Sequence, residues 1–557
     1  MKLGAVAALL AASAVFLALV LSAAAKLGAN YEEVVPYVLR PLDIRDPRPL
    51  SDVRIGHFVT SGQLPRLAYQ PRPDVRWPLL NQPYMTDHLS YGGVLLGAAG
   101  VDRLWAARLW HASFGVVLIW LVYDIAQLLG LGRRAGLIAS AIAATSLPLT
   151  FMYTWARFDE SLASFGPAVV LWALLRHAVD GRARWIWVAV VVAALAVSGK
   201  LTALWPLLGL AVAAGLAGWR PPSPRRVVLP AVVSAVLFAP FVGYSLATPA
   251  TGSEIGRRLR YIPDLFIGDT LPGTALSLIQ YLGSWGAGLN HVIRGVSDWP
   301  VNAVGQLLVV ATLVWLMART AAGGTRPRRR RLETQMLAFL GVVFLLVALF
   351  FRERRDYQFS LLVPLHAVAL AAFIDWCVIR ISSVGGNRAG PVAAALCGLV
   401  VAGNLVEQVG FERDLGDAGN AMFNLEVQRQ SAGWLVEHGV EHPVMVTFYA
   451  AGTYELLSDD AVRPVYAFPM FRRYRDYGGP AAEAPDARVA WRDLLDSESG
   501  ETLYAVLPRG VNPIEANHFD EPAIRAALLA VAPAEIAAVF SNRRGEPLLE
   551  IWRIGSD

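Results

Sequence analysis

The residues best suited to chemistry in this sequence are charged side chains that border long apolar segments. Asp43, Asp46 and Asp52 lie in a polar stretch that follows the first apolar run. A carboxylate there could act as a general base if it lies within hydrogen-bond reach of the proton it removes. Taken singly, each is better explained as a solvated side chain. The length of the stretch and its many prolines nevertheless favour an ordered, functional loop.

Two further polar groups stand at the ends of later apolar segments. Asp159 and Glu160 follow Arg157. Acidic residues favour the first turn of any helix, but the adjacent arginine favours a paired, ordered site. Lys200 stands alone in a turn between two apolar segments. Such a lysine either snorkels to a membrane interface or offers a point charge to a phosphate.

The composition separates a membrane part from a water-exposed part. Of 557 residues, 55% are hydrophobic and 17% charged, and the mean hydropathy is +0.44, whereas soluble domains carry roughly 25% charged residues. Residues 1–405 contain repeated apolar runs near the roughly 20 residues that a spanning helix needs. Residues 406–557 have an ordinary soluble composition. We therefore expect a membrane domain over 1–405 and a separate domain over 406–557.

Eleven apolar segments are expected to span the membrane. They are residues 3–25, 105–129, 135–152, 161–179, 185–199, 201–218, 227–246, 300–318, 335–351, 359–378 and 389–405. The first is longer than the roughly 7–15 residues of a signal-peptide core, which favours a retained helix over a cleaved signal.

The connecting loops alternate in charge and so predict a topology. Arginines cluster in every second loop, which the positive-inside rule makes cytoplasmic together with the N-terminus. The other loops are then external, namely 26–104, 153–160, the turn at Lys200, 247–299, 352–358 and everything after 405. Arg354, Arg355 and Tyr357 fall in one of these external loops, against the usual charge trend. Because arginine binds phosphate through paired hydrogen bonds, this loop is the best candidate phosphate clamp.

Other features restrict the class of protein. The net charge of +5 and pI near 9.2 are explained by the arginine-rich loops, so no nucleic-acid partner is expected. The two cysteines, Cys377 and Cys397, lie within apolar segments and give no disulfide framework. Zinc-ligand spacings, phosphate-binding glycine loops and the GxSxG motif are all absent from the sequence.

The C-terminal region predicts a small α/β domain without a catalytic constellation. Its patterns predict helices over 425–438 and 521–531, strands over 443–449 and 502–507, and a hairpin that pairs 536–540 with 548–554.

An amphipathic stretch, 276–289 in an external loop of the membrane region, is expected to lie at the membrane interface.

Several short motifs follow one another along the chain. They are Ser61-Gly62-Gln63-Leu64-Pro65, Asp87-His88-Leu89-Ser90-Tyr91, Ala107-Arg108-Leu109, Arg157-Phe158-Asp159, Ser198-Gly199-Lys200, and Arg354 to Tyr357 with Pro364. In this order they resemble motifs of the GT-C superfamily of membrane glycosyltransferases, in the branch of aminoarabinose transferases and protein O-mannosyltransferases. The order of parts is also similar over almost the whole chain. The sequence departs from the family in two places. The loop contains no Asp-Glu pair, and Leu89 replaces the proline usual after His88.

The resemblance implies an inverting transfer of a sugar from a polyprenyl-phosphate donor. A first-loop carboxylate would be the base, and the spacing from Gly62 favours Asp46, with Asp52 and Asp43 as alternatives. Asp159 would orient the acceptor or the base, and Lys200, Arg354 and Arg355 would stabilise the departing lipid phosphate. The implied substrate-binding residues are His88, Arg157, Glu160, Lys200, Arg354, Arg355 and Tyr357.

The remaining expectations concern partners and place. The acceptor would be an envelope lipid, glycan or protein, and the chain would lie in a bacterial inner membrane among membrane lipids. A divalent cation stays open as a cofactor because carboxylates from two loops converge, although such a site needs several oxygen ligands. Two other classes remain: a transporter or lipid flippase, which should show internal repeats and charges in the middle of its spans, and a non-catalytic assembly or receptor protein.

Overall fold

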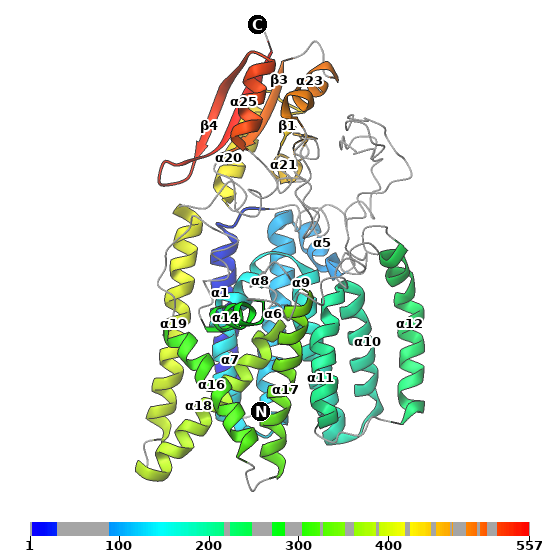
Figure 1. Ribbon diagram of the computed structural model, residues 1–557, viewed down its shortest axis with the longest axis vertical. Helices are drawn as coiled ribbons and strands as arrows, with labels where there is room; N and C mark the ends of the chain where they lie inside the picture. Colours follow the sequence, from blue (N-terminus) through cyan, green and yellow to red (C-terminus); the bar gives the residue numbers. More distant parts are fainter. Residues whose placement is uncertain are drawn as a thin grey trace.

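The computed structural model describes residues 3–29, 89–216, 223–247, 270–283, 303–322, 327–350, 361–385, 389–417, 424–446, 453–459, 461–467, 471, 486–497, 502–509 and 521–555. A bundle of long helices forms one half of the molecule, and a small α/β domain lies at one end of it (Figure 1). The first helix, α1 (Leu3–Ala24), packs against neighbouring helices on one face and ends beneath the α/β domain. We call the end of the bundle nearest this domain its outer end.

The helices of the bundle coincide with the apolar segments of the sequence. After α1 come α5 (Tyr91–Ala98), α6 (Arg103–Leu128), α7 (Gly132–Thr145), α8 (Leu147–Thr154), α9 (Phe158–Asp180), α10 (Ala183–Gly199), the 3₁₀ turn η3 (Leu201–Ala203), α11 (Leu204–Leu216), α12 (Pro224–Ala247), α14 (Thr270–Gly283), α16 (Ala303–Ala321), α17 (Pro327–Phe350), α18 (Val363–Gly385) and α19 (Ala389–Asp417).

One expected span differs from a simple helix. The segment 135–152 is divided into α7 and α8, which meet at an angle of 53°. Pro148 lies in the first turn of α8. Because proline has no N–H to donate to the preceding turn, it starts a new helix more readily than it continues an old one. As a result α8 turns inward, and all eight of its residues are buried.

Length and composition make this a multi-pass membrane protein. Within the described residues, five helices are long and apolar enough to cross a membrane, and the bent pair α7–α8 would make a sixth. Four shorter apolar helices accompany them. The element order shows a helix in each of the eleven expected segments, but the number of spans stays a prediction.

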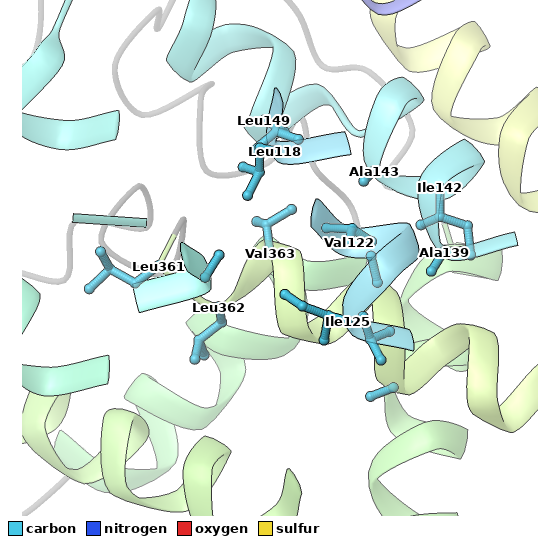
Figure 2. Close-up of a cluster of buried hydrophobic side chains, with 14 of the residues drawn as sticks. Leu118, Val122, Ile125, Ala139, Ile142, Ala143, Leu149, Leu361, Leu362 and Val363 are labelled. Carbon is cyan, nitrogen blue, oxygen red and sulfur yellow. The ribbon is translucent and has the colours of Figure 1, made fainter. Parts of the chain in front are cut away.

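The core of the bundle is apolar and continuous. Leu118, Val122 and Ile125 of α6 face a cluster that includes Ile142 of α7 and Val363 of α18 (Figure 2). Phe16 and Val20 of α1 belong to the same cluster. One face of α1 thus packs into the core of the bundle, whereas Leu3 and Leu10 on its other side are exposed.

The C-terminal domain has the mixed α/β character that the sequence predicts. Its five-stranded sheet has the order β2-β1-β3-β5-β4. The strands are β1 (Val444–Met445), β2 (Val465–Tyr466), β3 (Leu503–Pro508), β4 (Ala534–Ser541) and β5 (Pro547–Ile554), and the helices are α20 (Leu425–Glu437), α21 (Thr453–Leu457), α23 (Ala487–Ser497) and α25 (Glu521–Val531). β1 pairs in parallel with β2 and β3, and the expected hairpin is β4–β5.

The two parts of the chain are closely joined. Helix α19 continues through residue 405 to Asp417, so the predicted domain boundary at 405/406 falls within one helix and stays a prediction. Helix α20 lies next to the outer end of α1, where Leu27 and Asn424 form an antiparallel bridge.

Candidate active site

The outer end of α1 is held in place by a buried arginine. Arg108 of α6 is 1% exposed. Its Nη1 donates to the carbonyl oxygens of Ala24 (2.6 Å) and Leu27 (3.0 Å), and its Nη2 donates to that of Gly28 (3.2 Å). The end of a helix leaves such carbonyls without intrahelical partners, and the planar guanidinium can serve several of them at once. We call residues 24–29 the exit segment, since the polar first loop begins there.

The same helix holds the other end of the first loop. Trp110, two positions after Arg108, donates from Nε1 to the carbonyl oxygen of Leu89 at 2.6 Å. Residues 30–88 lie outside the described residues, so Asp43, Asp46, Asp52 and His88 are not placed. Their roles stay predictions. Both flanks of the loop are nevertheless held by the first turns of α6.

The C-terminal domain contacts the exit segment from the opposite side. Gln428 of α20 accepts from the backbone N–H of Ala29 and donates to its carbonyl oxygen, each at 2.9 Å. Thr453 of α21 donates to that same oxygen at 3.2 Å. The backbone N–H of Leu425 donates to the carbonyl of Lys26 at 3.1 Å. The backbone of Ala29 thus makes three hydrogen bonds with side chains of the C-terminal domain.

The last long helix contacts the same place through an acidic side chain. Glu412 of α19 is 8% exposed. It accepts hydrogen bonds from Ser22 and from Gln408 Nε2, and it pairs with Lys26 at 3.8 Å. Gln408 in turn accepts from Thr150 of α8 at 2.7 Å. This buried polar row joins α1, α8 and α19 at the outer end of the bundle.

The second acidic group lies at the corner between α8 and α9. Arg157 is the residue before α9, and its carbonyl accepts the first helical hydrogen bond, from Ser161 N at 3.1 Å. Asp159 and Glu160 occupy the first turn of α9, where the helix dipole favours negative charge. Their side chains lie outside the described part. The side chain of Ser161, directly after them, lies 2.6 Å from Nε2 of His111 on α6.

His111 joins this corner to α6 in an aromatic surrounding. Its ring packs against Tyr153 of α8 and Phe158 of α9, with centroid distances of 5.0 and 4.7 Å. His111 and Tyr153 are fully buried, and Phe158 is almost so. The first turn of α9 is therefore fixed to the same face of α6 that holds the exit segment.

Lys200 lies at the outer end of α10, in an extended conformation between α10 and η3. Its backbone N–H bonds to the carbonyl of Ala196 at 2.8 Å, and its own carbonyl accepts from Ala203 at 2.9 Å. Its side chain is partly exposed. The η3 turn packs against α9, so Lys200 and the Arg157 corner belong to neighbouring elements at the same end of the bundle.

The predicted phosphate clamp and the possible divalent cation both stay predictions. Arg354, Arg355 and Tyr357 lie in residues 351–360, outside the described residues, and stay predictions. Among residues that the structure describes, there is no group of three or more His, Cys, Asp and Glu side chains that could hold a metal ion.

The described groups can do two things chemically. They present a positive charge, Lys200, at the outer end of the bundle, where it would stabilise an anion. They also hold both flanks of an acidic loop close to α6. Sequence reasoning did not find His111, Glu412 or Gln428, although a histidine and a glutamate in or near apolar helices are signals of their own.

Known proteins resemble this chain in sequence over one part and in fold over nearly all of it. Residues 82–244 match the family model described as dolichyl-phosphate-mannose-protein mannosyltransferase. No curated protein sequence matches the chain.

Solved structures that share its fold include two of ArnT and one of AglB. ArnT from Cupriavidus metallidurans in the apo state has a TM-score of 0.56 at 13% identity, covering 97% of this chain and 97% of that one. The same ArnT bound to undecaprenyl phosphate has a TM-score of 0.54 at 14% identity, covering 99% and 98%. The archaeal oligosaccharyltransferase AglB from Archaeoglobus fulgidus, in complex with an inhibitory peptide and a dolichol-phosphate, has a TM-score of 0.53 at 14% identity, covering 91% and 69%.

Proposed function

We propose that this chain, a membrane glycosyltransferase with the GT-C fold, transfers a sugar from a polyprenyl-phosphate donor to an acceptor group at the outer face of a bacterial inner membrane. One observation carries the proposal: the fold of ArnT, a protein whose structure holds undecaprenyl phosphate, covers 99% of this chain. The coverage includes the C-terminal domain as well as the bundle. The acceptor is an envelope lipid, glycan or protein.

The chemical step moves one proton and one glycosyl group. The acceptor oxygen attacks the anomeric carbon of the sugar while the bond from that carbon to the phosphate oxygen breaks. The acceptor proton passes to a carboxylate of the first loop, with Asp46 as the first candidate and Asp52 and Asp43 as alternatives. The polyprenyl phosphate leaves with the bonding electrons. A single displacement of this kind inverts the configuration of the sugar.

The other site residues act on charge and position. Lys200, Arg354 and Arg355 stabilise the departing phosphate, where negative charge develops. Asp159 orients the acceptor or the base, and it stands in the first turn of α9, which His111 and Ser161 fix to α6. The bundle supplies an apolar surface for the prenyl chain, so the donor reaches the site from the membrane.

The topology in this proposal follows the charges of the loops. The arginine-rich turns face the cytoplasm, and the exit segment, Lys200, the start of α9 and the C-terminal domain face outward. The C-terminal domain lies at one end of the bundle (Figure 1) and contacts the exit segment there through Asn424 and Leu425. The proposal therefore places donor, acceptor and base on one side of the membrane.

A transfer assay in proteoliposomes tests the carboxylate. Purified wild type, Asp46→Asn, Asp52→Asn and Asp43→Asn are compared for turnover of radiolabelled polyprenyl-phosphate sugars. Loss of a general base lowers kcat by roughly 10²–10⁴-fold, so one variant should fall that far. Glu33→Gln, a neutralised acid earlier in the same loop, is the matched control and should keep its rate. Full turnover in the triple Asp→Asn variant would refute the loop base.

A further inference from the structure

We infer that Gln428 of the C-terminal domain is a positioning residue for glycosyl transfer: by binding both backbone groups of Ala29, it fixes the point at which the catalytic loop leaves the membrane. This inference rests on the proposed function. It assigns the C-terminal domain a part in the reaction, although that domain supplied no catalytic constellation in the sequence.

The contact between Gln428 and Ala29 is buried and uses both the oxygen and the nitrogen of the side-chain amide. Gln428 is 2% exposed, and Ala29 is fully buried. Both groups of the side-chain amide are used, Oε1 by the N–H of Ala29 and Nε2 by its carbonyl, each at 2.9 Å. The two residues are 399 positions apart. A buried amide that is satisfied in this two-point manner recognises a backbone in one position and one direction only.

The exit segment is held by both the bundle and the C-terminal domain, and we call this set of contacts the exit clamp. From the bundle, Arg108 holds the carbonyls of Ala24, Leu27 and Gly28. From the C-terminal domain, Gln428 and Thr453 hold Ala29. The direction in which the chain enters the first loop is thus set jointly by α6 and by α20, rather than by the loop itself.

Apolar packing gives the exit clamp a rigid support. Ala29 belongs to a small buried cluster with Ala107 of α6, Phe158 of α9 and Leu425 of α20. The cluster therefore connects the exit segment to the corner that carries Asp159. A shift of α20 would move the first-loop entry relative to that corner, which is where the proposed base and the acceptor must meet.

The test replaces Gln428 without emptying its place. Gln428→Met keeps the length of the side chain and removes both hydrogen bonds. Gln430→Met, on the same helix at an exposed position where the side chain donates to Glu426, is the matched control. Rates are expressed per donor-binding site, so that a loss of folded protein does not count as a loss of catalysis. We expect kcat to fall about tenfold or more in Gln428→Met with an unchanged KM for the donor, and to stay within about twofold in the control.

A reversible cross-link provides the rescue. Leu27 and Asn424 face each other in an antiparallel bridge flanked by the bond from Leu425 N to Lys26 O, a geometry in which Cα atoms lie about 4.5 Å apart and a disulfide can form. In the Gln428→Met background, Leu27→Cys with Asn424→Cys should regain rate when oxidised and lose it on reduction. Asn424 also caps α20, so the cysteine substitution itself can alter the rate. The oxidised and reduced forms of the same double-cysteine sample are therefore compared with each other.

The outcomes separate this inference from the proposed function. Equal rates in Gln428→Met and Gln430→Met, or a loss that the disulfide does not restore, would overturn the positioning role and leave the transferase intact. If the wild type turned over no donor, the proposed function would fail. The exit clamp would then be judged by hydrogen exchange at residues 27–29, which should be faster in Gln428→Met than in the control. Identical exchange would overturn it.

Discussion

The close approach of α9 and α10 at Gly166 is expected to be sensitive to one added methyl group. On α9, a Cβ added at Gly166 would lie 2.6 Å from the Cβ of Ala196 on α10. Carbon atoms in contact prefer about 3.5–4.0 Å, so Gly166→Ala forces α9 and α10 roughly 1 Å apart. Ala196 cannot yield by rotating, because its Cβ is fixed to the backbone. It is also the residue whose carbonyl accepts from the N–H of Lys200.

The size of the effect is the difference between two opposing terms. Overpacking of a tight interior costs about 1–3 kcal/mol. Alanine gains up to about 1 kcal/mol over glycine in a helix interior. We therefore expect a net destabilisation of about 1–2 kcal/mol for Gly166→Ala. Gly341→Ala on α17 meets nothing within 4 Å, so this matched control should be neutral or slightly stabilising.

The assay is the half-life of folded protein in lipid at a fixed elevated temperature, because membrane proteins of this size often unfold irreversibly. A loss of 1–2 kcal/mol corresponds to a factor of roughly 5–30. Gly166→Ala should shorten the half-life by about that factor. The double variant Gly166→Ala with Ala196→Gly should recover it, since the next atom lies 3.8 Å away. A stable single variant, or a double variant no better than the single, would refute this reasoning.

Three further predictions use the same half-life assay. Arg108→Met removes three buried hydrogen bonds and should cost about 3 kcal/mol, whereas Arg108→Lys should lose less because an ammonium still serves part of the set; equal losses would contradict the three-carbonyl role. His111→Phe should cost about 1 kcal/mol by removing the partner of Ser161, and His111→Gln should retain more stability than it. Glu412→Gln still accepts from Gln408 through its one amide oxygen, and its amide NH2 can donate to the Ser22 hydroxyl in place of accepting from it. It loses the pair with Lys26 and should cost less than about 1 kcal/mol. Glu412→Leu, which leaves the buried partners Ser22 and Gln408 without this acceptor, should cost about 1–3 kcal/mol, and a larger loss in Glu412→Gln than in Glu412→Leu would contradict this.

Most of the fold could be predicted because apolar length and charge alternation are local signals. Every expected apolar segment contains a helix, and the hairpin of β4 and β5 lies where the turn residues predict it. The break between α7 and α8 was not predicted, although Pro148 marks it. Strand β2, only two residues long, was also missed. So short a strand is stabilised by pairing with β1, a tertiary contact that leaves no pattern in its own residues.

Some residues of the candidate site could also be predicted from the sequence, and others could not. Charged residues such as Arg157 and Lys200 are conspicuous at the ends of apolar segments, and the structure places both at the outer end of the bundle. Gln428 gave no signal, because a glutamine on an amphipathic helix is common. Its partner is the backbone of Ala29. Every residue type has backbone N–H and C=O groups except for the N–H of proline, so the sequence does not show which residue Gln428 binds. The carboxylate of the first loop remains a prediction from the sequence.

One measurement tests the central claim most directly: the release of polyprenyl phosphate from a labelled polyprenyl-phosphate sugar by the purified wild-type chain in proteoliposomes supplied with envelope acceptors. The account predicts one polyprenyl phosphate released for each sugar transferred, with the label on the acceptor in inverted configuration. Folded protein that consumes no donor, or that moves the intact donor across the membrane without breaking its sugar–phosphate bond, would contradict the account and favour a transporter.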